Sequence, residues 1–490
     1  MQLNFGRSIE LSVLGFFIFI KLLSIHFVRT FYVADEYWQS LEVAHHKVFG
    51  YGYLTWEWDY KIRSYIYPFI ISNIYKVLAI MKLDYPSMII YSPRVFQAIL
   101  SGYAEYRFYL WHKNDATLLY LFMNPFWVYC ASRTLTNTME TCLTMITLSV
   151  FPWDNKRKYG SRYLWLVGFM CFIRPTAAIM WAPLCLYHIY TSKKTILQLI
   201  RDYVFIGLCI FTIATAIDSY YYGEFVITPW EFFKINVLTD VASHYGVEPS
   251  YWYLFNALPV FLLVKVYILP ISIYQIIKTQ KINSKPVITL GIVSWTITIY
   301  SMLPHKEHRF ILPLLPLLIY ICTCFEYPKN TSVTIKKVIN VIMYLINLSV
   351  LIYIAMIHQY GSLQIMSYLG DQISNSTSNV DVMFLTPCHS TPFYSHVHEN
   401  IPMEFLTCEP NLNNQENYQD QADIFFSNPM DWIDNRYSNS TLPKLLVMYD
   451  NLVPKIGKFL DDNYHLVVEL FDSYHPSPNR GKFLSLYKLK

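Results

Sequence analysis

Glycine and charged residues are scarce in this 490-residue chain. It contains 15 glycines, and Asp, Glu, Lys and Arg make up 15% of it, against roughly 25% in an ordinary soluble domain. Phosphate-cradling glycine loops are therefore excluded, and no P-loop, dinucleotide-binding fingerprint, nucleophile elbow or HExxH motif occurs. A site for ATP or a nucleotide sugar is thus unsupported. The formal net charge of +4 gives no basis for nucleic-acid binding.

Metal-type cysteine pairs are also missing. None of the nine cysteines forms a CxxC pair, so no zinc or other metal site is predicted. Only Cys388 and Cys408 lie in a polar region, near the C-terminus. In an oxidising compartment they would form a disulfide, whose loop closure would add roughly 3 kcal/mol of stability. Two free thiols are the alternative.

Hydrophobic residues, in contrast, make up 54% of the chain, more than one soluble core can bury, so lipid must solvate part of them. The first apolar run, from Leu11 to Val28, precedes no small-residue cleavage site and predicts an uncleaved signal anchor. Within it, Lys21 and His26 either snorkel or face other helices. Further apolar stretches cover 67–82, 88–110, 117–131, 139–152, 163–190, 203–217, 254–277, 286–303, 311–325 and 338–357. They predict a mainly α membrane protein of about 10 to 12 membrane helices, in which Arg174-Pro175 divides the 163–190 stretch into two.

Basic clusters between these stretches predict which loops are cytosolic. They are Lys156–Lys158, Lys193-Lys194, Lys278–Lys285 and Lys329–Lys337. This assignment places 29–66, 218–253, His305–Arg309 and everything after about 358 in the lumen. The alternation fails between 67 and 152, so one of the four segments there is re-entrant, interfacial or merged with a neighbour.

The C-terminal region differs in composition from the rest, which divides the chain into a membrane domain, 1–357, and a lumenal α/β domain, 358–490. Strands are predicted at Val380–Leu385, Leu445–Tyr449, Leu466–Phe471 and Phe483–Tyr487, with a helix at Pro454–Asp461. Glycosylation sequons begin at Asn375 and Asn439 in this lumenal part.

The strongest polar signal follows the first apolar run, where Asp35 and Glu36 open a helical pattern. At helical spacing Asp35 shares one face with Trp38, Gln39, Glu42 and His46. Acid, amide, ring and imidazole groups together suit sugar hydroxyls. The alternative is that Asp35 simply caps an interfacial helix.

A second signal is the run of five ionisable residues from His305 to Arg309, between two apolar stretches. Such a run needs water, headgroups or a charged ligand around it. Its cations suit a phosphate at the membrane surface. The alternative is a basic hairpin turn that binds lipid headgroups.

Two shorter polar breaks complete the pattern. Arg133, Asn137 and Glu140 recur at i, i+4 and i+7, which fits one helix face pointing into a cavity. The second break is Arg174-Pro175, for which a proline kink with a snorkelling arginine is the alternative.

These residues resemble a known family. Tyr32–His46 (YVADEYWQSLEVAHH), Tyr51–Trp58 (YGYLTWEW), Arg63-Ser-Tyr and His305–Phe310 (HKEHRF) are similar to glycosyltransferase family 22. Its members are dolichol-phosphate-mannose-dependent mannosyltransferases of the glycosyltransferase C (GT-C) superfamily. Val382–His398 resembles the branch of the family that adds the third mannose to the glycosylphosphatidylinositol (GPI) precursor. The similarity runs nearly end to end, with Ala34 as a departure where relatives often carry proline.

The resemblance implies a GT-C fold in the endoplasmic reticulum membrane, with an active site facing the lumen and no cofactor. It implies α-1,2 transfer of mannose from dolichol-phosphate-mannose to a GPI lipid that carries two mannoses, with inversion. Asp35 would be the catalytic base, with Glu36 holding the acceptor or tuning Asp35. His305, Lys306 and Arg309 would bind the donor phosphate, and Glu307 would orient Lys306 or Arg309. Further candidates for substrate contact are Gln39, His45, Glu57, Arg63, Arg133, Asn137 and Arg174.

Other readings stay open at this point. A relative in the same family would act on the dolichol-linked N-glycan precursor or add the fourth GPI mannose. A transporter would show related halves, and no internal repeat is visible. A scaffold protein would tolerate neutralisation of Asp35. The enzyme hypothesis requires Asp35 and the Lys306 region to meet at one membrane face.

Overall fold

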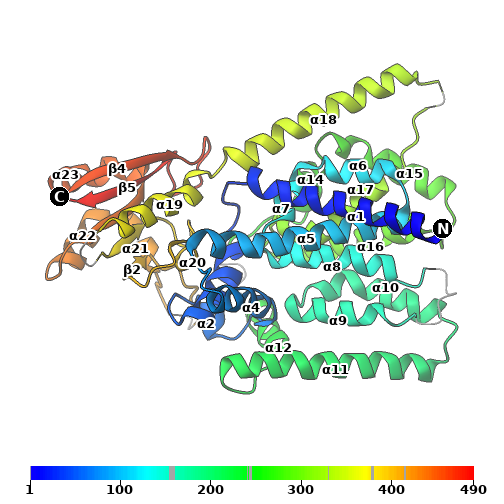
Figure 1. The fold of residues 1–490 in the computed structure, drawn as a ribbon, viewed down its shortest axis with the longest axis horizontal. Helices are drawn as coiled ribbons and strands as arrows, with labels where there is room; N and C mark the ends of the chain where they lie inside the picture. Colours follow the sequence, from blue (N-terminus) through cyan, green and yellow to red (C-terminus); the bar gives the residue numbers. More distant parts are fainter. Residues whose placement is uncertain are drawn as a thin grey trace. The chain divides into compact units, whose positions relative to one another are not determined.

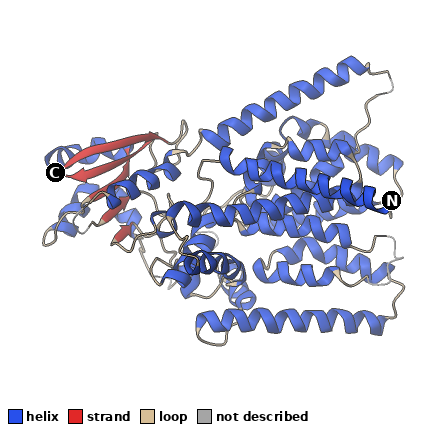
Figure 2. Ribbon diagram, in the orientation of Figure 1, coloured by secondary structure: helices blue, strands red, loops and turns tan. Residues whose placement is uncertain are grey.

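In a computed structural model, all residues are described except 1, 154–159, 240, 242–244, 329, 377–379 and 413–414, and residues 2–10 are described by their backbone alone. The expected cytosolic cluster Lys156–Lys158 lies outside the described residues. So does Lys329, the first residue of the expected cluster Lys329–Lys337. The chain is mainly helical (Figure 2) and forms two compact units. We call Met1–Ile25, Tyr60–Tyr67 and Arg94–Leu351 the helical unit, and His26–Asp59, Pro68–Pro93 and Ile352–Lys490 the mixed unit.

The apolar stretches predicted for the helical unit all form helices, several of them broken. They are α1 (Gln2–Phe27), α5 (Pro86–His112), α6 (Asp115–Phe122), α7 (Pro125–Ala131), α8 (Thr136–Val150), α9 (Tyr163–Ile173), α10 (Ala177–Thr191), α11 (Ile196–Tyr222), α12 (Thr228–Phe233), η2 (Lys234–Leu238), η3 (Tyr253–Ala257), α14 (Leu258–Leu262), η4 (Leu263–Tyr267), α15 (Leu269–Thr279), α16 (Lys285–Met302), η5 (His308–Leu314), α17 (Leu315–Thr323) and α18 (Val333–Met356). In Figure 1, α8, α9, α10 and α11 run beside one another, and α9 packs against the other three.

Local sequence explains where these helices begin and end. Helix α11 starts at a capping box, in which Thr195 Oγ1 accepts from Gln198 N, and it ends at Gly223 with φ of 76°. Between α6 and α7, Asn124 Oδ1 accepts from Trp127 N at 2.8 Å, and Pro125 follows. Arg174 has extended backbone because Pro175 follows it, which separates α9 from α10. The predicted division of the 163–190 stretch is therefore confirmed.

Among the described residues, two helical segments are long and apolar enough to cross a membrane, Ile196–Tyr222 and Val333–Ser374. A third results if Tyr253–Tyr267 and Leu269–Thr279, which meet at an angle of 70°, form one broken span. Bulky apolar side chains of α11 such as Leu197 and Phe205 are exposed, as expected of side chains that lipid solvates. The mainly α, membrane-type fold is thus confirmed, and the count of about 10 to 12 spans stays a prediction.

Helices α1 and α5 approach each other closely in the helical unit. A side chain at Gly102 would bring its Cβ to 2.7 Å from Ile18 Cα, so only glycine fits there. One turn further along both helices, Lys21 Nζ lies 2.6 Å from Glu105 Oε1, and both side chains are fully buried. The Trp127 indole N–H donates to the same carboxylate. Lys21 therefore faces neighbouring helices and does not snorkel.

Replacing Glu105 with alanine should destabilise the protein by about 3–5 kcal/mol, because Lys21 would keep a buried charge without a counter-charge. The measurement is thermal unfolding in detergent micelles. The double variant Lys21→Met/Glu105→Met should recover most of that loss, since it removes both charges together. A double variant as unstable as Glu105→Ala would contradict this account.

The mixed unit contains one five-stranded sheet and short helices. Its elements are η1 (Tyr37–Leu41), α2 (Glu42–Phe49), α3 (Trp56–Asp59), most of α4 (Ile66–Ile80), α19 (Gly361–Ser374), β1 (Val382–Leu385), α20 (Tyr394–Val397), β2 (Met403–Phe405), α21 (Gln421–Ser427), α22 (Pro429–Tyr437), β3 (Leu445–Tyr449), η6 (Asp450–Leu452), α23 (Val453–Asn463), β4 (Tyr464–Phe471) and β5 (Phe483–Leu489). The four predicted strands and the predicted helix are confirmed as β1, β3, β4, β5 and α23.

The strand order is β2-β1-β3-β5-β4. Strand β1 runs parallel to both neighbours, with Phe384 opposite Phe405 of β2 and Val447 of β3. Strand β5 is antiparallel to β3 and β4. The carboxyl ends of β1, β2 and β3 therefore lie at the same edge of the sheet.

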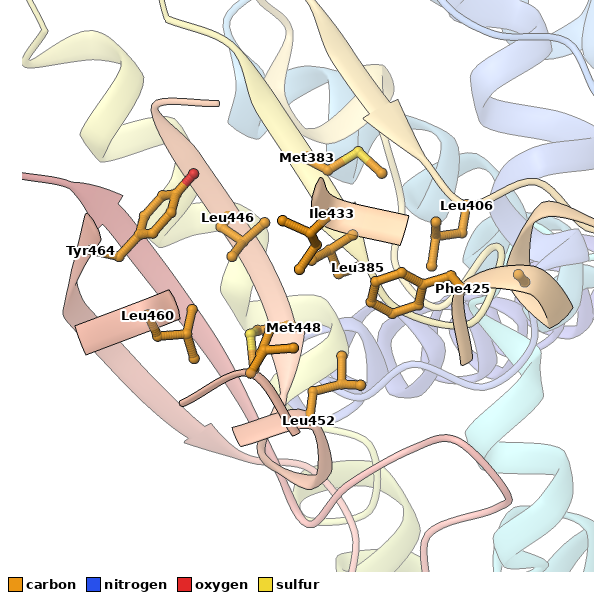
Figure 3. Close-up of a cluster of buried hydrophobic side chains, with 12 residues drawn as sticks. Met383, Leu385, Leu406, Phe425, Ile433, Leu446, Met448, Leu452, Leu460 and Tyr464 are labelled. Carbon is orange, nitrogen blue, oxygen red and sulfur yellow. The ribbon is translucent and has the colours of Figure 1, made fainter. Parts of the chain in front are cut away.

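Alternation along the strands builds the core of this domain. Met383, Leu385, Leu446 and Met448 point to one face of the sheet, where Phe425 and residues of α22 and α23 cover them (Figure 3). Helix α19 packs on β4 and β5. The β1 and β3 positions are buried at every residue, which is why they read as continuous apolar runs in the sequence.

Candidate active site

The acid-bearing helix of the mixed unit begins at Asp35 and Glu36. Asp35 is partly exposed, whereas Glu36 is buried. The next five residues, Tyr37–Leu41, form a π-helical turn before α2. Such turns insert extra residues into a helix and occur frequently at functional sites.

The π-turn changes the face that regular helical spacing predicts. The Trp38 indole donates to Thr391 O at 3.0 Å, and buried Glu42 contacts residues 393 to 395. His45, and not His46, joins them, with its Nε2 2.9 Å from His398 Nδ1. Regular helical spacing of 3.6 residues per turn does not predict this shift, because nothing in the local sequence indicates that the π-helical turn contains an extra residue.

Gln39 and Glu57, both candidates for substrate contact, lie together in the mixed unit. Gln39 Nε2 donates to Glu57 Oε2 at 3.1 Å. Gln39 is buried, and Glu57 on α3 is partly exposed. The pair offers an amide and a carboxylate from the first predicted lumenal loop, a suitable combination for sugar hydroxyls.

Glu42 fixes residues 387–398, which we call the clasp segment, to the acid-bearing helix. Its Oε1 accepts from Phe393 N at 2.9 Å and from Ser395 Oγ at 2.6 Å, and its Oε2 accepts from Ser395 N at 3.0 Å. Burial raises the pKa of Glu42 to about 7, against the opposing effect of these hydrogen bonds. Burial and nearby His398 lower the pKa of His45 to about 3, so its ring is neutral. The helix that carries Asp35 is therefore positioned by the C-terminal domain.

The raised pKa of Glu42 predicts a pH-dependent contribution to stability. A carboxyl whose folded pKa lies above its unfolded value of 4.5 destabilises the fold progressively as pH rises from about 4.5 to about 7. The variant Glu42→Gln lacks this titration. Its unfolding free energy, minus that of the unmodified protein, should therefore rise by roughly 3 kcal/mol across that window. Denaturant titrations at several pH values measure it, and a difference independent of pH would contradict it.

A disulfide joins Cys388 to Cys408, with Cα atoms 5.9 Å apart. Cys388 follows β1 and Cys408 follows β2, so the bond ties together two loops at the carboxyl edge of the sheet. In the part of the chain that the structure describes, one cluster of metal-ligating types occurs, formed by these cysteines and His389. Because the sulfurs are bonded to each other, they offer no thiolate to a metal.

The cationic hairpin of the helical unit is organised around Glu307. Arg309 donates from Nε to Glu307 Oε2 at 2.7 Å and from Nη2 to Oε1 at 2.6 Å, and His305 Nε2 lies 3.1 Å from Oε1. Burial by itself would raise the pKa of Glu307, but Arg309 and His305 outweigh it and hold the pKa well below its usual range. Glu307 is thus charged and orients Arg309 through a bidentate pair.

Lys306 has different partners from the other cations of the hairpin. Its Nζ donates to Glu248 O at 2.7 Å and also to the carbonyls of Leu303 and Pro304. Its side chain is buried and ties the loop around Glu248 to the hairpin. To bind a phosphate, Lys306 would have to exchange one of these carbonyls, and its predicted role as a phosphate ligand stays a prediction.

The two shorter polar breaks meet this hairpin. Asn137 Nδ2 donates to Arg309 O at 2.9 Å. Arg174 Nε lies 2.9 Å from Glu140 Oε2, and the guanidinium carbon of Arg174 lies 6.0 Å from the ring centroid of Phe310. Arg174 is therefore paired inside the protein and does not snorkel. Glu140 therefore joins the candidate residues, and its helical spacing from Asn137 is the sequence signal that marks it.

Arg133 lies between α7 and α8, so the expectation that it shares one helix face with Asn137 and Glu140 is wrong. Arg133 is buried, donates from Nε to Tyr129 O at 3.1 Å and stacks over the Tyr129 ring at 4.1 Å. Arg63 O accepts from Tyr222 Oη at 2.6 Å. Asn375 and Asn439 are exposed, but Thr377 of the first sequon lies outside the described residues, and glycosylation stays a prediction.

The candidate residues thus form two sets. Asp35, Glu36, Gln39, His45 and Glu57 belong to the mixed unit. The helical unit holds Arg63, Arg133, Asn137, Arg174, His305, Lys306, Glu307 and Arg309. The expected meeting of Asp35 with the Lys306 region stays a prediction.

Comparison with known proteins supports the resemblance found in the sequence. A family model described as the Alg9-like mannosyltransferase family matches residues 12–398, a range that ends with the clasp segment. GPI mannosyltransferase 3 of Drosophila melanogaster is 41% identical over 462 residues, covering 91% of this chain and 81% of that protein. Human GPI alpha-1,2-mannosyltransferase 3 is 36% identical over 497 residues, covering 99% and 88%.

Among solved structures, ArnT from Cupriavidus metallidurans bound to undecaprenyl phosphate is similar, with a TM-score of 0.62 and 10% identity over 97% of both chains. At that identity the likeness shows the fold, which is the GT-C fold expected from the sequence. Because these relatives are named as mannosyltransferases, they favour an enzyme over the transporter and scaffold alternatives. This chain is a membrane-embedded glycosyltransferase that belongs to the Alg9-like mannosyltransferase family.

Proposed function

We propose that this protein transfers mannose in α-1,2 linkage from dolichol-phosphate-mannose to the second mannose of a GPI precursor, adding the third mannose in the lumen of the endoplasmic reticulum. The carrying observation is the match to relatives named GPI mannosyltransferase 3 and GPI alpha-1,2-mannosyltransferase 3 over 91% to 99% of this chain. The match includes the acid-bearing helix, the cationic hairpin and the clasp segment.

The proposed reaction requires a general base. A β-linked mannosyl phosphate that yields an α-mannoside reacts with inversion, in one displacement with the acceptor hydroxyl opposite the leaving phosphate. That hydroxyl must lose its proton as it attacks the anomeric carbon. Asp35 suits this role because it is partly exposed on a helix that the clasp segment holds in place.

The leaving group is a lipid phosphate whose negative charge grows in the transition state. Arg309, held in one orientation by Glu307, offers a fixed guanidinium for that charge. His305, bound to the same carboxylate, is a second polar group beside that guanidinium. A lipid-linked donor also agrees with the solved fold neighbour, whose description names a bound undecaprenyl phosphate.

The test is the lipid that accumulates when the protein is lost from cells. A GPI precursor with two mannoses is the expected intermediate, and membranes that regain the unmodified protein should extend it by one mannose. Accumulation of a three-mannose GPI lipid would indicate the fourth-mannose step instead. A truncated dolichol-linked oligosaccharide would indicate the N-glycan precursor.

A further inference from the structure

Helix α18 leads from the membrane into the C-terminal domain. The helical segment that it begins is long and apolar enough to cross a bilayer, and its apolar stretch 338–357 has about the 20 residues that a crossing needs. The side chains of Ile352, Met356 and Ile357, at the end of this stretch, are still exposed. A helix that crosses with this stretch leaves the hydrocarbon near residue 357. Whatever packs beside this end of α18 therefore lies at the level of the lipid headgroups.

The loop between β4 and β5, residues 472–482, is fixed beside the end of α18 (Figure 1). Asp472 O accepts from Gln359 N at 2.6 Å, and Asp472 Oδ1 accepts from Ser362 N at 2.8 Å. At the base of the loop, Asp472 N donates to Lys482 O at 2.7 Å. The buried Asp472 thus joins the loop to the start of α19, directly after α18.

An aromatic contact continues from this junction into the loop. The ring of Tyr474 stacks on that of Tyr353 in the last turn of α18, with centroids 6.5 Å apart and 19° between the ring planes. The ring centroid of Phe471 lies 4.6 Å from that of Tyr474. Tyr474 is nevertheless 59% exposed. Tyrosine is enriched at membrane–water interfaces, where its ring meets the apolar layer and its hydroxyl meets water, and Tyr474 is placed for that role.

The loop beyond Asp472 carries basic side chains and no acid. Residues 473–482 (SYHPSPNRGK) include His475, Arg480 and Lys482 and neither Asp nor Glu. Lys482 is exposed and Arg480 is partly exposed. Arg480 is close enough to interact electrostatically with His358, which follows α18. Basic side chains that adjoin the end of a membrane helix suit the anionic headgroups of a bilayer surface.

We propose that the 472–482 loop lies in the headgroup layer of the membrane, with Tyr474 at the boundary with the acyl chains and Arg480 and Lys482 bound to anionic phospholipid headgroups. The charge of the loop and its attachment to the end of α18 favour a lipid surface over a protein partner. Because Asp472 ties the loop to the sheet, this contact sets the depth of the C-terminal domain at the bilayer. The clasp segment belongs to that domain, so the loop also helps to set the height of the acid-bearing helix.

Photo-cross-linking of the full-length protein in lipid nanodiscs tests the position of the loop. The probe is Tyr474→benzoylphenylalanine, and the nanodiscs contain equal amounts of phosphatidylserine and phosphatidylcholine. Illumination should attach phospholipid to position 474, as identified by mass spectrometry of the loop peptide. The same probe at Leu466, exposed near the other end of β4, is the matched control and should give no lipid adduct above background. A probe at exposed His475 repeats the test if the first variant does not fold.

The composition of the adducts tests the charged part of the proposal. Arg480→Gln and Lys482→Gln, each combined with the probe at position 474, should lower the ratio of phosphatidylserine to phosphatidylcholine adducts. We expect a decrease of about fivefold for each change, the factor that one basic side chain near an anionic membrane surface contributes. Lys490→Gln removes an exposed cation at the end of β5 far from the loop, and it should leave the ratio unchanged.

Absence of lipid adducts at positions 474 and 475 in folded protein would overturn the proposal, because the loop would then lie in water. Equal labelling at positions 474 and 466 would also overturn it, since lipid would then contact the domain without preference for the loop. An unchanged adduct ratio in both glutamine variants would overturn the binding of anionic headgroups. None of these measurements depends on mannosyl transfer, so a failure of the proposed function would leave this inference standing.

Discussion

Replacing Asp35 with asparagine is expected to lower the rate of mannosyl transfer about a thousandfold, within the range that general-base catalysis contributes. Asparagine has nearly the same size and shape but cannot take up the proton of the acceptor hydroxyl. The hydrogen bond from Ser40 Oγ reaches the backbone carbonyl of residue 35 and is kept in the variant. The measurement is the initial rate in membranes, normalised to the amount of folded protein.

The matched control for this change is Asp462→Asn, on the exposed last turn of α23. It makes the same chemical substitution far along the sequence from the acid-bearing helix and should leave the rate unchanged. Thermal unfolding of both variants should match that of the unmodified protein. A near-normal rate for Asp35→Asn would remove Asp35 as the base and would leave Glu36, which is buried, as the next acid to test.

Much of the secondary structure follows from hydrophobic patterning alone. Long apolar runs form the helices of the helical unit, and short apolar runs bounded by turn residues form β1, β3, β4 and β5. Strand β2, at Met403–Phe405, has three residues and alternates in burial. A segment that short is below what sequence periodicity can resolve, and it is held in place by its pairing with β1.

Helix α4 illustrates what patterning leaves open. Its residues read as a membrane span, yet from Pro68 onward it belongs to the unit that contains 26–59 and the C-terminal domain. Fifteen residues of helix extend only about 22 Å, short of a bilayer core of roughly 30 Å. Helix α8 has the same length, so the reason to single out α4 is its place in the mixed unit and not its length. If α4 does not cross, three segments remain between 67 and 152, and the alternation that the basic clusters require is restored. Hydropathy measures how apolar a segment is. It does not show whether lipid or another part of the protein covers its apolar side chains.

The clasp segment was beyond sequence reasoning for a different reason. Glu42 and Ser395 are separated by 353 positions, and their contact depends on how two distant parts of the chain fold together. Only the resemblance of Val382–His398 to one branch of the family marked that segment as important. The structure supplies the physical reason, because this segment holds the acid-bearing helix.

The second large effect is expected at Arg309. Arg309→Gln should lower kcat about 100- to 1,000-fold, the usual cost of removing one preorganised donor from a developing anion. The reason is that Glu307 holds the guanidinium in a bidentate pair, so no reorganisation is needed when charge develops on the leaving phosphate. The measurement is the initial rate as a function of donor concentration, with acceptor in excess.

A double-mutant cycle with Glu307 separates positioning from binding. Glu307→Gln alone should lower kcat about tenfold, because Arg309 stays present but loses a charged partner that fixes it. If Glu307 acts through Arg309, the double variant should be no slower than Arg309→Gln alone. The exposed pair Arg436–Glu404, 2.7 Å apart in the C-terminal domain, is the matched control, and the same glutamine changes there should leave kcat unaltered. If the losses of kcat at Glu307 and Arg309 were fully additive, Glu307 would act independently of Arg309. The hairpin would then have to stabilise the leaving group in a different way.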